Sequence, residues 1–428
     1  MAVVGLVAVF PAAAAEALRQ TPAQPVGLGA GVTAPGATVD ELLAIAQRMN
    51  PNAAAAALET QAALARVDAA GRLPDPMFKT EFKDIDRNQD NALPDDLGRI
   101  EYRVEQTFPL WGKLGLEEDV ARAEAGAARQ SQRAVDLEIA ARIKTVFARY
   151  YAAFESARLT RELYRTVATL TDVTQSRYAQ GFGEQADAIR AQVEATRLRT
   201  ELVRFEAAQR QAAAQLNALM DRRAGASLAD PAALRPVPEP TLAVAELVDR
   251  AELENPAVNA AEARVRAAEG EKALVGKTWY PDVTLGAAIQ QFVEQDRRTP
   301  GYEAMIGFEI PLQWGLREAW EREAAANLAA SRRRRDAEAA SLRGELADAY
   351  WSLAGARDVA ALLEDVQLPQ ARLALQAALR GYEQGRSDMN AVLDTEQRVF
   401  ETMLRLLDVQ VEQQARLAEI ERLIGRDL

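Results

Sequence analysis

The sequence RYYAAFESAR at residues 149–158 returns, 199 residues further along the chain, as DAYWSLAGAR at residues 348–357. Other landmarks return in the same order and at nearly the same distance. They are Asn50-Pro51 and Asn255-Pro256, Phe108-Pro109-Leu110 and Ile310-Pro311-Leu312, and RYAQG (177–181) and GYEQG (381–385). Because chance matches would not keep both an order and an offset, the sequence indicates two fused copies of one unit of about 200 residues.

The composition excludes much of enzyme chemistry. None of the 428 residues is cysteine or histidine, which rules out a disulfide framework, a zinc site with these ligands, a thiol nucleophile and a histidine-based triad. The net charge of −12 disfavours nucleic acid as a partner, because phosphate binding requires a basic surface. Only 6% of the residues are aromatic and 27% are charged, which indicates long helices with thin interfaces. We therefore expect no enzymatic activity, no cofactor and no metal site.

The N-terminal residues have the pattern of a secretory signal. Residues 2–10 are apolar but too few to span a bilayer, and Ala13-Ala14-Ala15 provides a small-residue cleavage pattern. We predict a signal peptide at residues 1–15 and a linker at 16–38, with an ordinary flexible tail as the alternative. No later segment has the long apolar run of a transmembrane helix, so insertion into a membrane would require a β-barrel.

Both copies of the unit follow one plan. The first structural repeat is assigned to residues 39–228 and the second to 242–428, with a proline-rich linker at 229–241. Each repeat is predicted to begin with a single helix, at 39–71 or 242–278. Two strands follow in each repeat, at about 77–85 and 100–110 in the first and at about 282–292 and 302–312 in the second. Apolar and polar residues alternate along these segments, which gives each strand one face of each kind.

A long helical hairpin completes each repeat. Residues 113–177 contain no proline, and as one helix they would extend about 95 Å. The equivalent stretch at 316–380 contains Pro369, where we predict a kink. The chain then turns at YAQGFGEQAD (178–187) or YEQGRSDMN (382–390), whose glycines suit a helix end with positive φ, and a second helix returns.

Four strands cannot close on themselves, whereas three chains would supply twelve, which is a reasonable number for a pore. Closure removes exposed strand edges and is obligatory for strands in a bilayer. The predicted fold class is therefore mainly α with a membrane β-barrel portion. In this fold, duplicated units of a helical hairpin and two strands form a homotrimer, whose 12-stranded barrel is continued by a long α-helical barrel.

Several segments of the chain resemble the TolC-like outer-membrane efflux factors, and in particular their heavy-metal (CzcC/CusC-like) branch. They are VEQTFPLWGKLGLEEDVARAEA (104–125), LPDPMF (73–78), WYPDV (279–283) and RGYEQGRSDMNAVLDTEQRVF (380–400). The resemblance implies a homotrimer in the outer-membrane lipid of a Gram-negative bacterium, extending into the periplasm. It also implies a periplasmic adaptor protein and an inner-membrane RND-type pump as partners, and passive conduction of substrate, here heavy-metal cations, without catalysis.

The same resemblance assigns roles to individual residues. It places a channel constriction at the periplasmic tip on Asp394 and Asp187, although Ala391 stands where the family has a further acid. A solvated aspartate on a helix face is the alternative for Asp394. The adaptor would contact the hairpin tips at Tyr178, Gln180, Gly181, Tyr382, Gln384 and Gly385, and helix capping explains the glycines equally well. From the strand alternation we expect Glu101, Arg103, Glu303 and Glu309 to line the barrel lumen.

Other function classes compete with this interpretation. A soluble periplasmic coiled-coil adaptor or scaffold would explain the helices, with the strands forming a small β-domain. The same channel could also serve the efflux of drugs or other organic compounds, because selectivity in such systems normally resides in the pump. An enzyme ranks third, because the sequence offers no recognisable acid–base pair.

Overall fold

The computed structural model describes residues 34–85, 97–181, 184–238, 243–292, 300–384 and 386–428. The first repeat contains α1 (Val39–Met49), α2 (Pro51–Ala70), β1 (Met77–Ile85), β2 (Leu97–Phe108), α3 (Lys113–Ala179) and α4 (Gln185–Leu219). The second contains α5 (Val244–Glu254), α6 (Pro256–Gly276), η2 (Lys277–Trp279), β3 (Val283–Phe292), β4 (Gly301–Phe308), α7 (Trp314–Ala361), η3 (Leu362–Gln367), α8 (Leu368–Glu383) and α9 (Met389–Ile424). The signal peptide predicted at residues 1–15 lies outside the described residues.

The expectation of a single helix at the start of each repeat is wrong, because the segment forms two helices that meet at an Asn-Pro pair. Asn50 has extended backbone angles (φ −68°, ψ 123°), as expected for a residue whose α conformation is disfavoured by a following proline. Its side-chain oxygen accepts hydrogen bonds from the amides of Asn52 and Ala53, and so caps α2. Asn255 breaks the helix in the second repeat in the same way.

The four strands form one antiparallel sheet in the order β1-β2-β3-β4. Because β2 and β3 are neighbours, the central ladder of the sheet joins the first repeat to the second, with Arg103 opposite Ala288. The strands β2 and β4 end at Phe108 and Phe308, earlier than the predicted limits of 110 and 312. A proline follows each strand within three residues, and proline cannot donate a ladder hydrogen bond.

The turn from strand to helix in the first repeat is bound to the second repeat by a hydrogen bond and an ion pair. Gly112 precedes α3 with φ +79°, a left-handed conformation that glycine adopts without steric cost. On either side of it, the Trp111 indole nitrogen donates to the Pro281 carbonyl at 2.9 Å and the Lys113 ammonium lies 2.7 Å from an Asp282 carboxylate oxygen. The sheet and the helices are therefore joined by contacts between the repeats as well as by the chain.

Each repeat has its own hydrophobic core at the level of its short first helix. In the first repeat, Leu42 of α1 packs with Ile143 of α3 and Leu216 of α4, and all three are fully buried. In the second repeat, Leu247 of α5, Leu346 of α7 and Ile420 of α9 form the corresponding cluster. Equivalent elements therefore bury equivalent faces, which agrees with the duplicated sequence.

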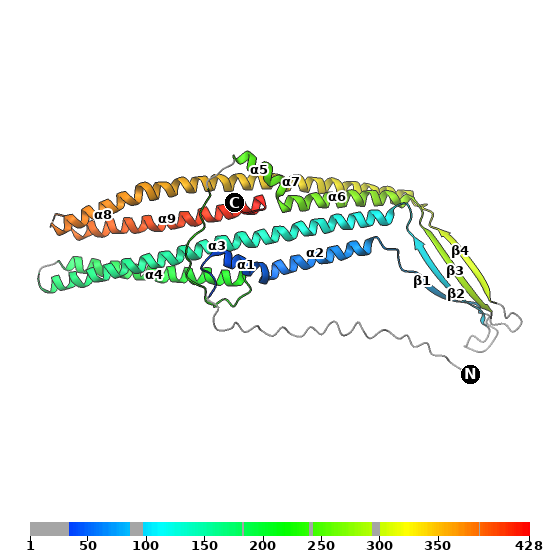
Figure 1. The fold of residues 1–428 in the computed structure, drawn as a ribbon, viewed down its shortest axis with the longest axis horizontal. Coiled ribbons are helices and arrows are strands. Elements are labelled where there is room, and N and C mark those ends of the chain that lie inside the picture. The colour runs from blue at the N-terminus through cyan, green and yellow to red at the C-terminus, as the bar shows by residue number, and fades with distance from the viewer. Residues whose placement is uncertain (1–33, 86–96, 182–183, 239–242, 293–299, 385) are drawn as a thin grey trace, which may run out of the picture.

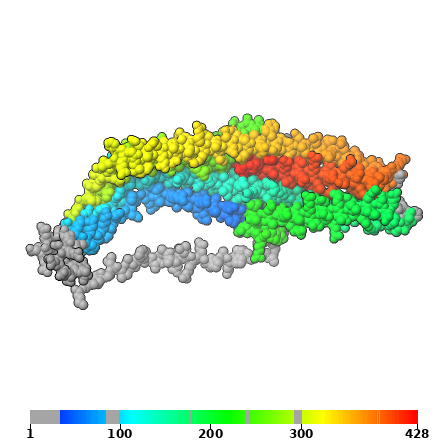
Figure 2. All heavy atoms as spheres, turned by 180° about the vertical axis from the view of Figure 1, so that it is seen from behind, coloured from blue at the N-terminus to red at the C-terminus, as the bar shows by residue number. Residues whose placement is uncertain are grey.

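The helices lie roughly parallel in an elongated body, with the sheet at one end and the turns of both hairpins at the other (Figure 1). Figure 2 shows α7, α8 and α9 of the second repeat, in yellow to red, lying along the first repeat. At Pro369, where a kink is expected, a π-helical segment, η3, directly precedes the helix that contains the proline and accommodates its missing amide hydrogen. Among the described residues, no helix combines the length and apolar character needed to cross a membrane.

Candidate functional site: the two sheet faces and the hairpin tips

One face of the sheet is apolar and exposed. Strand residues point alternately to opposite faces, and one set on all four strands is mostly aromatic or aliphatic. Its members include Phe78, Phe82, Tyr102, Val104, Leu285, Ile289, Tyr302, Ile306 and Phe308, which are between 40% and 80% exposed in the single chain. An apolar surface of this extent marks a contact with a membrane or another protein. It needs an apolar environment that the single chain does not supply.

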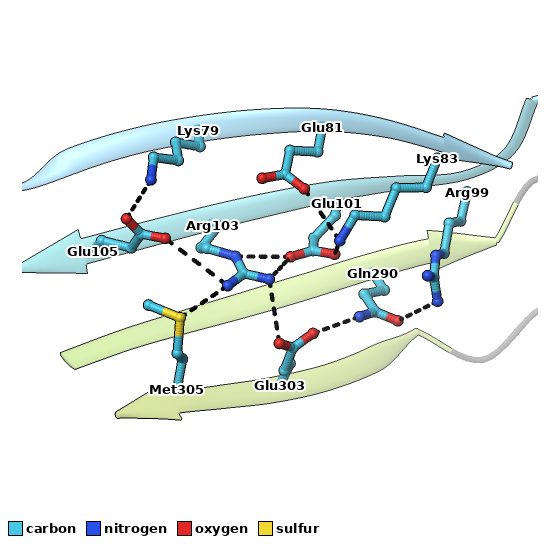
Figure 3. A network of polar contacts seen from close by, with 10 residues as sticks. All are labelled: Lys79, Glu81, Lys83, Arg99, Glu101, Arg103, Glu105, Gln290, Glu303 and Met305. Atoms are coloured by element: carbon cyan, nitrogen blue, oxygen red, sulfur yellow. Dashed lines mark hydrogen bonds and ion pairs between the residues drawn. The ribbon is translucent and has the colours of Figure 1, made fainter. Parts of the chain in front are cut away.

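The opposite face carries a network of charged side chains centred on Arg103 (Figure 3). The Arg103 guanidinium donates to a Glu101 carboxylate oxygen at 2.8 Å and to a Glu303 oxygen at 3.2 Å, and it lies 3.9 Å from Glu105. It also donates a hydrogen bond to the Met305 sulfur at 3.2 Å. The Arg103 side chain is only 12% exposed, so these groups largely replace water around it.

Two lysines complete the network from the neighbouring strand. Lys79 and Lys83 of β1 each lie 2.5 Å from a glutamate of β2, Glu105 and Glu101 respectively. Each of these glutamates therefore faces a lysine on one side and Arg103 on the other. The fully buried carboxylate of Glu101 is balanced by two cations, which is the condition for burying such a charge.

The reach of Arg103 across the sheet depends on small residues in β3. In the register of the sheet, Lys79, Arg103, Ala288 and Glu303 form one row across the four strands. Ala288 leaves room above β3 for the guanidinium to pass to Glu303. In the next row, a Cβ atom on Gly286 would lie 3.2 Å from the Met305 methyl group and 3.3 Å from the Glu105 side chain. Local sequence in β3 thus makes space for a contact between β2 and β4.

Three of the four residues expected in the lumen therefore lie together. Glu101, Arg103 and Glu303 share the polar face and contact one another. Glu309 follows the last residue of β4, is exposed, and donates its backbone amide to the Asp282 carbonyl at 3.4 Å. It is not among the groups that contact Arg103.

The hairpin tips bring Arg190 of α4 near two aspartates, Asp187 of the same helix and Asp388 directly before α9. Asp187 lies in the first turn of α4 and pairs with Arg190 at 3.5 Å. Asp388, the residue before α9, accepts hydrogen bonds from the Ala391 amide at 3.1 Å and the Asn390 side chain at 2.9 Å. These hydrogen bonds, with a smaller contribution from the positive charge of Arg190, lower the pKa of Asp388 below its usual value.

Asp394 lies in the second turn of α9 and its side chain is exposed, as are Tyr178, Gln180, Gly181 and Gln384, whereas Tyr382 is half-buried. Gly181 has φ +79° directly after the cap of α3. Gly385 lies outside the described residues. The exposed members of the predicted tip set are thus gathered at the two helix turns, while Asp394 and Asp187 belong to different hairpins.

Sequence reasoning missed Asp388, Arg190 and the two lysines of β1. Asp388 was within reach of prediction, because an aspartate directly before a helix is a typical N-cap. The lysines alternate with Phe78 and Phe82, and this period of two was also available. Within the described parts of the chain, no cluster of acidic side chains has the arrangement of a metal site.

Comparison with known proteins identifies the family. Residues 42–222 and 247–426 match the family described as outer membrane efflux protein, one match for each repeat. The chain belongs to the outer membrane efflux protein family. Its members are channels, so family membership favours a channel over the soluble adaptor and enzyme interpretations.

Individual relatives of this outer membrane efflux protein cover nearly its whole length. It is 27% identical over 406 residues to the cobalt-zinc-cadmium resistance protein CzcC of Cupriavidus metallidurans, a match that covers 91% of this chain and 90% of that protein. The solved structure of CusC is similar with a TM-score of 0.78 and 18% identity, covering 91% of this chain and 92% of the other. VceC of Vibrio cholerae gives a TM-score of 0.77 at 19% identity, with 91% and 96% covered. The structural likenesses bear on the fold alone.

Proposed function

We propose that this protein is the outer-membrane channel of a tripartite efflux system and that it passively conducts heavy-metal cations from the periplasm to the exterior. The two-faced sheet at the end of the helical body is the observation that supports a channel most directly. In a closed barrel, its apolar face would meet lipid and its charged face would line water. The relationship to a cobalt-zinc-cadmium resistance protein supports metal cations as the cargo.

The proposed assembly is a homotrimer. The described sheet has β1 and β4 as its outer strands, and in a ring of three copies each β4 would pair with β1 of the next copy. The helices would continue this barrel towards the periplasm, where an adaptor protein and an RND-type pump would join. Mass measurement of the detergent-solubilised protein should give three chains, and a protein that remains in the aqueous phase without detergent would contradict the proposal.

We further propose that Asp394 and Asp187 narrow the channel at the tip and attract cations. A ring of carboxylates in a pore favours cations over anions. In planar bilayers, Asp394→Asn should reduce cation preference, while Asp358→Asn, on an exposed position of α7, serves as the control. Equal selectivity in both variants and the wild type would make Asp394 an ordinary solvated residue.

The tip residues Tyr178, Gln180, Gly181, Tyr382, Gln384 and Gly385 are proposed to contact the adaptor. Replacing Gly385 with a bulky residue should abolish efflux while the trimer still assembles. Loss of the trimer itself would favour a purely structural role.

The cargo can be tested in a strain that lacks this protein. Growth would be compared on cobalt, zinc and cadmium salts and on dyes and hydrophobic antibiotics, with and without the wild-type gene. Sensitivity to metals alone is expected, because the pump that feeds the channel would be a metal pump. Sensitivity to organic compounds alone would retain the channel and contradict the metal assignment.

A further inference from the structure

We propose that Arg103 is a specificity-determining residue that prevents the strand end of the channel from retaining divalent cations. This inference rests on the proposed function, in which the charged face of the sheet lines the conduit. The Arg103 guanidinium lies among three carboxylates and balances their negative charge, which would otherwise attract divalent cations to this face.

The contacts of Arg103 are those of a bound cation. Carboxylates of Glu101, Glu303 and Glu105 approach the guanidinium from both sides of β3, at the distances given above, and the Met305 thioether completes the set. Carboxylate oxygens together with a sulfur atom are also donors that divalent metals accept. A metal ion that passes along this face therefore meets carboxylates that are already neutralised.

The duplicated sequence shows that this arginine is an asymmetric feature. With the offset of 202 residues that relates Pro109 to Pro311, Glu101 corresponds to Glu303 and Arg103 corresponds to Met305. Both repeats thus supply the glutamate, but only the first supplies the cation. One guanidinium contacts the glutamates of both copies. The residue equivalent to Arg103 in the second copy is Met305, whose sulfur accepts a hydrogen bond from the same guanidinium.

Lys79 provides the matched comparison. It lies on the same face and in the same row of the sheet as Arg103, and its removal changes the charge by the same amount. However, among the described residues Lys79 forms an ion pair only with Glu105, and its side chain is 40% exposed, so it lies at the margin of the network. If only the net charge of this face mattered, replacing either Arg103 or Lys79 by a neutral residue would change divalent-cation binding equally. If the position of the charge matters, only the replacement of Arg103 would change it.

The test uses the purified full-length protein in detergent, with Co²⁺ alone as the probe. Equilibrium dialysis of Arg103→Met should show one additional Co²⁺ bound per chain, and Arg103→Lys and Lys79→Met should resemble the wild type. In planar bilayers, Co²⁺ should interrupt the current through Arg103→Met at concentrations at least roughly tenfold lower than for the wild type, a difference of about 1.4 kcal/mol. Equal responses of Arg103→Met and Lys79→Met would overturn the inference.

A variant in the wild-type background keeps the inference falsifiable even where Arg103→Met does not fold. The Glu303→Gln variant, which keeps Arg103, should bind as much Co²⁺ as the wild type does, because Arg103 already balances these carboxylates. A loss of Co²⁺ binding in Glu303→Gln would show that these carboxylates hold metal beside Arg103, contrary to the inference. A wild-type protein that forms no conducting channel would instead contradict the proposed function, so the two failures are distinguishable.

Discussion

Asn50 and Asn255 make the same two kinds of hydrogen bond in the two repeats. Each caps the helix that follows it with its side-chain oxygen, and each donates its side-chain nitrogen at 2.8 Å to a carbonyl at the end of the returning hairpin helix, Leu219 for Asn50 and Leu423 for Asn255. Both side chains are almost fully buried. One amide therefore fixes the break between two helices and attaches it to a third.

Asn50→Ala should lower the free energy of unfolding by about 2 kcal/mol, with roughly half from the lost cap and half from the unpaired Leu219 carbonyl. Asn255→Ala should have a similar effect. Chemical denaturation in detergent, followed by circular dichroism, measures both. The neighbouring Asn52→Ala, at an exposed position, is the control and should stay within about 0.5 kcal/mol of the wild type. A single helix through residue 50 would instead predict that Asn50→Ala is stabilising.

Lys144→Met should destabilise the protein by about 3 kcal/mol, because it removes one of two cations around a buried carboxylate. Lys144 of α3 lies 2.7 Å from Glu421 of α9, both side chains are 3% exposed, and Arg235 of the linker contacts the same carboxylate at 3.1 Å. Asp427, which also contacts Lys144, is 72% exposed. Asp427→Asn should therefore cost less than about 1 kcal/mol. If both variants lost a similar amount of unfolding free energy, the stabilisation would come from the exposed Lys144–Asp427 pair.

Glu396 makes the stability of the hairpin end depend on pH. Burial, and to a smaller extent the negative charge of Glu194, raise the pKa of the Glu396 carboxyl above its ordinary 4.5. The folded protein therefore binds this proton more tightly than the unfolded chain does. The resulting stabilisation is fully present below the ordinary pKa and is lost as the pH rises through the raised value.

Glu396→Gln should accordingly raise the melting temperature at neutral pH, and the difference from the wild type should vanish below about pH 4. Melting curves across this pH range measure the difference. Glu412→Gln, at an exposed position of the same helix, provides the control. A difference that grows as the pH falls would have the wrong sign for a raised pKa.

Gly181→Val should strain the first hairpin tip by about 1 to 2 kcal/mol, because a β-branched residue is poorly accommodated at φ +79°. Gly181→Asn should be close to the wild type, since asparagine adopts this conformation more readily and a Cβ atom there meets no neighbour among the described residues within 4 Å. Hydrogen exchange at the tip measures the strain, and efflux measures its effect on adaptor contact. Equal effects of both substitutions would show that the tip requires the absence of a side chain at this position and not the positive φ angle.

The repeat could be predicted because its landmarks recur in order at a nearly constant offset, and the strands and helices because each has its own local periodicity. The Asn-Pro break was missed although Asn50-Pro51 was recognised as a landmark, because helical periodicity on both sides concealed a capping residue between two helices. The Arg103 network was beyond prediction in detail. It joins Arg103 to a residue 200 positions away, and it depends on the register of β2 with β3 and on the small size of Ala288. The register, which decides that Ala288 is the residue Arg103 must pass, is not a property of one segment.

The junction between β2 and β3 has a consequence for the origin of this chain. It joins the last strand of one repeat to the first strand of the other, and in the proposed trimer β4 and β1 of neighbouring copies would form a junction of the same kind. In an ancestor of half the length, six copies would have closed a symmetric ring with only one type of junction between paired strands. After gene fusion, every second junction lies within one chain. Its residues can then differ from those at the junctions between chains. Arg103 crosses such an internal junction, so a charge that six identical subunits would have to carry six times would be present only three times in the proposed trimer.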